Sequence, residues 1–146
     1  MQSIASEMFD AVKRVDKVEA QRMMTEAALM QKHGVDCIQG TPWTSLFFLQ
    51  DGTLWHTDLH AHGMVACSSM HASRTSWVGG HLTFDSGVAF KGRTSQVIIS
   101  KQFKHVLHGS TGTCAGRYAI TAVMDQRSLT SAKKCGLGDP KAKRQP

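Results

Sequence analysis

The sequence predicts an α+β fold, in which a long N-terminal helical segment is followed by an antiparallel β meander, sandwich or small barrel. Three observations predict it: a three- and four-residue apolar repeat over the first thirty residues, a change to period two after Pro42, and short Gly-, Ser- and Asp-rich breaks thereafter. The length of 146 residues suits one domain. We place this domain at residues 1–135 and expect a mobile basic C-terminal tail at residues 136–146.

The N-terminal segment has an amphipathic pattern whose apolar stripe shifts after Val18. Before that point the stripe is formed by Ile4, Met8, Ala11, Val12 and Val15, and beyond it by Met23, Met24, Ala27, Ala28 and Met30. This fits either one helix over residues 4–33 or two helices with a break near residues 19–21. A continuous helix would be about 45 Å long at 1.5 Å per residue, more than a small β body covers. We therefore expect a homo-oligomer formed through the N-terminal helix.

The β half begins with a predicted hairpin. Residues 44–49 and 53–59 alternate in polarity on either side of Asp51-Gly52, a dipeptide that favours a two-residue turn. Further strands are expected at residues 63–70, 79–85, 88–91, 95–100, 102–108 and 117–124, and a short helical turn at residues 128–134.

Composition narrows the class of protein. The chain is 41% hydrophobic and 19% charged, too apolar for a disordered chain, and no run approaches the twenty apolar residues of a membrane span. The first residues lack the basic and apolar regions of a signal peptide, so we expect a cytoplasmic protein with no membrane partner. Four widely spaced cysteines without a C-x-x-C pair fit reduced thiols.

The charge is concentrated in the second half of the chain. Residues 1–73 hold five Lys/Arg and eight Asp/Glu, whereas residues 74–146 hold twelve and three. A basic surface attracts polyanions, so RNA or DNA is the expected partner; the alternative is an ordinary solvated outer face. The candidate polyanion-binding residues are Arg74, Lys91, Arg93, Lys101, Lys104 and Arg117.

A histidine run suggests a metal site. If residues 53–62 form one strand, His56, His60 and His62 share a face with Asp58, which could serve as a ligand or orient one. Imidazoles spaced in this way could bind a divalent ion such as Zn, Ni or Fe. The alternative is that this face is polar and solvated.

A second histidine pattern concerns catalysis. The run His81-Leu-Thr83-Phe84 resembles the H-x-T-hydrophobic half-motif of the 2H phosphoesterases, in which two such histidines act as acid and base on a phosphodiester. The resemblance covers four residues, and the family requires a second copy, for which His108-Gly-Ser110 and His71-Ala-Ser73 are candidates. The resemblance implies His81, Thr83 and His108 as catalytic residues of metal-independent phosphodiester cleavage.

The sequence thus leaves three functions open. The first is a basic domain that binds RNA or DNA, with histidine-based phosphodiester cleavage as its enzymatic form. The second is a non-catalytic self-assembling structural or virion-type protein, and the third is a metal-binding domain that uses the histidine cluster. Within residues 74–135 only Asp85 and Asp125 supply carboxylates, which argues against a two-carboxylate glycosidase or an acidic two-metal nuclease.

Overall fold

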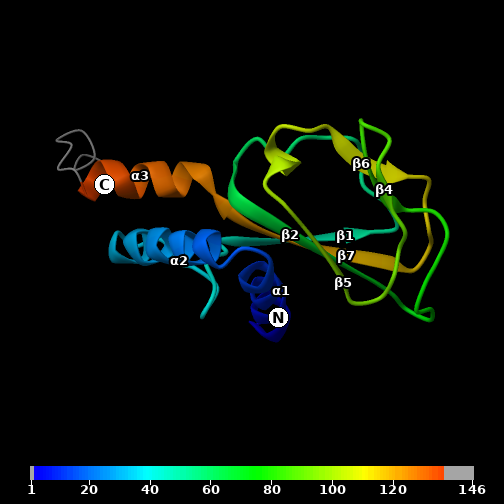
Figure 1. Cartoon of the computed structure of the whole chain (residues 1–146), viewed down its shortest axis with the longest axis horizontal. Coiled ribbons are helices and arrows are strands. Elements are labelled where there is room, and N and C mark those ends of the chain that lie inside the picture. The colour runs from blue at the N-terminus through cyan, green and yellow to red at the C-terminus, as the bar shows by residue number, and fades with distance from the viewer. Residues whose placement is uncertain (1, 137–146) are drawn as a thin grey trace.

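The computed structural model describes residues 2–136 and has the predicted α+β class with antiparallel sheets (Figure 1). In chain order the elements are α1 (Gln2–Val15), α2 (Lys17–Lys32), β1 (Ser45–Gln50), β2 (Ala61–His71), β3 (His81–Phe84), β4 (Ala89–Phe90), β5 (Gln96–Ser100), the 3-10 helix η1 (Gln102–Lys104), β6 (His108–Thr111), β7 (Arg117–Asp125) and α3 (Gln126–Gly136). The predicted tail lies outside the described residues except for Gly136, which ends α3. Within the described part, no helix has both the length and the apolar character that a membrane span requires.

The N-terminal segment forms two helices, so of the two expected arrangements the structure has the broken one and not the single long helix. The break lies at Asp16, whose Oδ1 accepts a hydrogen bond from the Glu19 backbone N–H at 2.9 Å and caps α2. Met23 and Met30 are fully buried in the chain's own core. These two methionines therefore do not form the interface face expected for self-assembly, and the self-assembly itself stays a prediction.

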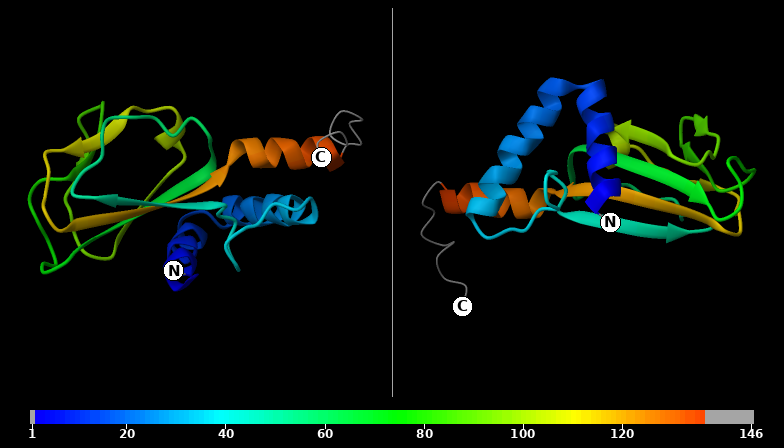
Figure 2. Two further views of the ribbon diagram at one scale, coloured as in Figure 1. Left: turned by 180° about the vertical axis from the view of Figure 1, so that it is seen from behind. Right: turned by 90° about the horizontal axis from the view of Figure 1, so that it is seen from below.

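The larger sheet has the strand order β1-β7-β2-β5 and is antiparallel. Alternate residues of β2 and β7 face the helices and form the main core with them, and α1 lies across this face while α2 and α3 extend side by side beyond the end of the sheet (Figure 2). The sheet residues of this core include Met64, Ala66, Ile120, Ala122 and Met124.

The opposite face of the larger sheet packs against a second sheet with the order β4-β3-β6. Val65, Phe103 and Val123 form a small apolar core between the two sheets. Residues 53–56 run beside β6 through backbone hydrogen bonds and extend this second sheet. The result is a two-sheet arrangement of the jelly-roll type, without a closed barrel.

The predicted hairpin of residues 44–49 with 53–59 is wrong. The turn does form, with φ of 62° at Asp51, but β1 pairs with β7. The Asp51 N–H donates to the Arg117 carbonyl at 2.7 Å, and the Asp51 carboxylate accepts from the Gly116 N–H at 3.0 Å. These bonds fix the turn to the start of β7, and the chain then crosses to the other sheet. Residues 102–108 are expected as a strand, but 102–107 form η1 and a loop, and only His108 lies in a strand, as the first residue of β6.

Candidate ligand cavity between the two sheets

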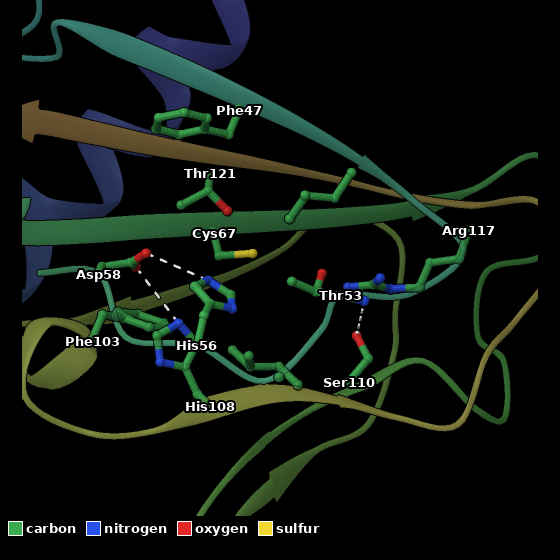
Figure 3. Close-up of a pocket in the computed structure, with 13 residues that line it drawn as sticks. Phe47, Thr53, His56, Asp58, Cys67, Phe103, His108, Ser110, Arg117 and Thr121 are labelled. Carbon is green, nitrogen blue, oxygen red and sulfur yellow. Dashed lines mark hydrogen bonds and ion pairs between the residues drawn. The ribbon is translucent and has the colours of Figure 1, made fainter.

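A cavity of about 240 Å³ lies between the two sheets. Alternation along the strands creates its mixed lining, because β7 turns Arg117 and Thr121 toward it and β1 turns Phe47 and Leu49. The apolar lining is Phe47, Leu49, Leu82 and Phe103, and the polar lining includes Thr53, His56, Asp58, Cys67, His108, Ser110, Arg117 and Thr121 (Figure 3).

Two histidines and a carboxylate converge in this cavity. His56 Nε2 lies 3.5 Å from Asp58 Oδ1, and His108 Nε2 lies 3.6 Å from Asp58 Oδ2 (Figure 3). One ligand atom from each of the three residues lies within 4.8 Å of the other two. The backbones of His56 and His108 are joined by reciprocal hydrogen bonds of 2.8 and 2.9 Å, so the second sheet itself holds the two rings together.

The second ring nitrogens of both histidines are also engaged. His56 Nδ1 lies 2.7 Å from the Leu54 carbonyl oxygen, and His108 Nδ1 lies 2.8 Å from that of Val106. A carbonyl only accepts, so each Nδ1 carries the proton, and in a neutral ring each Nε2 is a lone-pair acceptor. In neutral rings both Nε2 lone pairs would therefore point at the Asp58 carboxylate, with no hydrogen atom between them. A proton or a metal cation between these atoms would relieve the repulsion.

The pKa of His108 also indicates that the cluster favours a positive charge. His108 is 3% exposed, and burial alone would lower its pKa, but the interaction with Asp58 and the hydrogen bond to Val106 raise the pKa above its ordinary value. Phe84 and Phe103 pack against the His108 ring and exclude water from that side. The Asp58 carboxylate thus stabilises positive charge between the two rings.

Arg117 reaches into the cavity from β7 (Figure 3). The residue is 3% exposed, and within the part of the chain that the structure describes its Nη1 has no hydrogen-bond partner and its guanidinium forms no ion pair. Burial lowers the pKa of Arg117, and the nearby Cys67, Cys114 and Asp51 only partly offset this lowering. Gly80 makes room for the side chain, since a Cβ there would come within 2.9 Å of Arg117 Cδ. A buried cation with an unused donor is a site for an anion.

Hydroxyl groups surround the guanidinium end of the cavity. Ser110 Oγ accepts a hydrogen bond of 2.8 Å from the Thr53 N–H, which leaves the hydroxyl proton free to donate. Cys67 also lines the cavity, but it is buried, and this burial raises the pKa of its thiol. We therefore do not assign Cys67 a nucleophilic role.

A second, more open depression of about 640 Å³ meets the cavity at the histidine end. It shares Phe47 and Asp58 with the cavity and also contains Asp36, Leu59 and Asp125. Asp58, the carboxylate of the cluster, thus also borders this open depression, whereas Arg117 lines only the cavity of the two.

The predicted metal set of His56, His60 and His62 is not brought together. Residues 53–62 are not one strand, because a turn at Leu59-His60 precedes β2 and ends the alternation on which the prediction depended. His60 is exposed, and His62 contacts Glu26 at 2.8 Å and Gln126 at 2.7 Å. Of the three, only His56 belongs to the cluster in the cavity.

The predicted catalytic set of His81, Thr83 and His108 is also separated. In the β3 and β6 register His108 is opposite Phe84, and His81 is opposite Thr111. His81 and His108 therefore project to opposite faces of the second sheet. His81 Nδ1 accepts from the Gly92 N–H at 3.0 Å, and the Thr83 hydroxyl contacts that of Thr111. His108 alone lines the cavity.

The six predicted polyanion-binding residues occupy three places. Arg74, Lys91 and Arg93 line one open depression of about 820 Å³. Lys101 pairs with Asp16 and Glu19, and Lys104 lies beside it in another depression. Arg117 is inside the cavity, so it cannot contribute to an outer surface.

Comparison with known proteins adds no family. No protein-family model matches the chain, and no curated protein gives a significant sequence match.

The feature that sequence reasoning missed is the convergence of His56, Asp58 and His108. The His-x-Asp spacing was a local signal for part of it, but the pairing of residues 53–56 with β6 has no local signal.

Proposed function

We propose that the protein is a mononuclear non-haem iron oxygenase that uses a small 2-oxo acid as co-substrate. The observation that carries this proposal is the cluster of His56, Asp58 and His108 beside an unpaired buried arginine in the same cavity. Two histidines and one carboxylate on one face of an ion, with further positions open, are the ligand set of non-haem Fe(II) oxygenases.

The donor set fits such an ion. Bonds of about 2.1 Å bring neighbouring ligand atoms to about 3 Å, close to the present 3.5 and 3.6 Å between Nε2 and carboxylate oxygens. Each Nδ1 is already tied to a backbone carbonyl, the outer contact that fixes the tautomer of a metal-binding histidine. His56, Asp58 and His108 would hold the ion, and the cavity would leave its other positions accessible.

Arg117 supports the choice of co-substrate. In the view of Figure 3 it enters the cavity from the end opposite the histidine cluster, with Ser110 beneath it. A 2-oxo dicarboxylic acid such as 2-oxoglutarate could place one carboxylate on this guanidinium and turn its 2-oxo acid end toward the cluster. The volume of about 240 Å³ lies below the range of about 300–1,000 Å³ for drug-sized ligands, which suits so small an acid.

The chemistry is balanced by the 2-oxo acid. A bound Fe(II) would supply the activation of O₂: one oxygen atom would convert a C–H bond of a substrate to C–OH, and the other would convert the 2-oxo acid to CO₂ and a carboxylic acid one carbon shorter. The 2-oxo acid supplies the two electrons that the second oxygen atom requires. In this scheme Arg117 and Ser110 orient the 2-oxo acid, and the open depression beside Asp58 admits the molecule to be oxidised.

The test is ternary complex formation. Mn²⁺, which is redox-stable here, should raise the melting temperature of the wild type, and 2-oxoglutarate should raise it further only when Mn²⁺ is present. Fe(II) with 2-oxoglutarate under air should then release succinate. A His56→Ala variant should lose both shifts, and Arg117→Met should keep the metal shift and lose the 2-oxoglutarate shift.

His60→Ala is the matched control, since His60 is an exposed histidine four residues from His56 and outside the cluster. It should behave as the wild type. If Mn²⁺ and 2-oxoglutarate leave the melting temperature of the wild type unchanged at millimolar concentration, the proposal is wrong. Metal binding without any effect of 2-oxoglutarate would retain the metal site and reject the oxygenase.

A further inference from the structure

We propose that Arg74, Lys91 and Arg93 form an exosite that binds the phosphate backbone of a nucleic acid. The proposal goes beyond the oxygenase reaction and does not depend on it, because this depression is separate from the cavity that holds the histidine cluster and shares no lining residue with it.

The three cations are fixed side by side by the backbone. Residues 74–77 and 91–94 run antiparallel, with a bridge between Ser76 and Arg93 and a hydrogen bond of 2.9 Å from the Thr94 N–H to the Thr75 carbonyl. The Thr94 hydroxyl donates to the Arg74 carbonyl at 2.9 Å. The two segments therefore present their side chains on one surface, with Arg74 on one segment and the other two cations on its neighbour.

The charge of this surface is not neutralised nearby. All three cations are exposed, no carboxylate lines the depression, and none of the three forms an ion pair within the described part of the chain. Lys101 differs in this respect, because it lies 3.6 Å from a carboxylate oxygen of Asp16 and 3.3 Å from one of Glu19. The positive potential of Lys101 is therefore reduced by its carboxylate partners, whereas that of Arg74, Lys91 and Arg93 is not.

The remaining lining favours phosphate over other anions. Thr75, Ser76 and Thr94 supply hydroxyl groups between the cations, and Arg, Lys, Ser and Thr side chains are the usual contacts of phosphate oxygens in nucleic-acid complexes. His81 Nδ1 accepts from the Gly92 N–H at 3.0 Å, so the neutral ring carries its proton on Nε2 and adds a donor to the same depression. An open depression of about 820 Å³ suits a polymer backbone.

Fluorescence titration with a labelled single-stranded RNA and a DNA duplex, each at two salt concentrations, tests the exosite in the full chain. Neutralising Arg74, Lys91 and Arg93 to Gln should weaken binding at least tenfold at low salt and reduce the salt slope by about two to three contacts. Lys101→Gln is the control for loss of one charge and should leave the affinity within twofold. Gln at exposed positions should preserve the fold, which circular dichroism checks.

The oxygenase proposal and the exosite proposal can be rejected independently of each other. His56→Ala and Arg117→Met should keep wild-type affinity for the oligonucleotide, and the triple Gln variant should keep the Mn²⁺ and 2-oxoglutarate shifts. The exosite is rejected if the wild type binds no oligonucleotide at low salt, or if the triple variant binds as tightly as the wild type. Equal or tighter binding of polyglutamate at matched charge would also reject it, since it would reveal a general anion surface.

Discussion

Replacing Arg117 with Met should stabilise the protein without ligand while it abolishes co-substrate binding. The guanidinium is buried, one of its nitrogens lacks a partner among the described residues, and burial lowers its pKa. An unsatisfied buried polar group costs about 1–3 kcal/mol, and a charged group more. Met keeps an unbranched stem of similar length and brings no charge, so the free energy of unfolding should rise by about 1–3 kcal/mol.

Urea unfolding at neutral pH in a buffer without carboxylate or phosphate measures this change. For a domain of nearly 150 residues the same gain corresponds to about 2–4 °C in melting temperature per kcal/mol. Lys91→Met is the matched control, because Lys91 is exposed and its replacement should change stability by less than about 0.5 kcal/mol. A loss of more than 1 kcal/mol in Arg117→Met would refute the reasoning, since the guanidinium would then have a stabilising partner inside the protein.

Three further predictions concern the scaffold. Burial alone would raise the pKa of Asp125, but hydrogen bonds from Ser128 at the start of α3 lower the pKa below its ordinary value. Asp125→Ala should thus cost about 1 kcal/mol at neutral pH, and in urea unfolding this difference should shrink below about pH 4, as the wild-type carboxylate protonates. Gly79→Ala should destabilise the protein more than Gly87→Ala in thermal melts. Both glycines have φ near +84°, but of the two only Gly79 would bring a Cβ against a backbone oxygen, that of Thr113. Met23→Glu should abolish the cooperative unfolding transition, since Met23 is fully buried. Ala28→Glu, on the exposed face of α2, is the control and should keep the transition. A Met23→Glu variant that stays folded and only dissociates in sedimentation would instead place Met23 in an oligomer interface.

The strands of the fold were largely predictable because their signal is local. Period-two patterning located β2, β5 and β7 to within a few residues, and turn residues located the breaks between them. Helix capping at Asp16 was also a local signal, yet the shift of the apolar stripe placed the break three residues too late. The reason is that α2 begins directly after the cap at Asp16 and packs in a new direction, so the apolar stripe changes only in the residues beyond the cap.

Pairing between strands was not predictable in the same way. The Asp51-Gly52 dipeptide correctly indicated a turn, but a turn does not determine which strand its flanks pair with. Residues 53–56 pair with β6, far along the chain, and that pairing joins His56 to His108. The sequence presented these two histidines as parts of two different hypotheses, one for metal binding and one for acid–base catalysis, because only the fold places them side by side.

Arg117 gives the clearest reason why the site was harder to predict than the fold. A cation at the start of a strand in a basic segment is normally solvated, so it was assigned to an outer surface. Alternation on β7 sets Arg117, Thr121 and Val123 on one face, but alternation alone does not say that a second sheet covers that face. Because the second sheet covers that face, Arg117 is buried, and it is the one candidate polyanion-binding cation that is withdrawn from solvent. Positions that break a local rule inside an otherwise consistent fold are where function is expected, so the departure of Arg117 from the predicted surface is itself the strongest support for a ligand in the cavity.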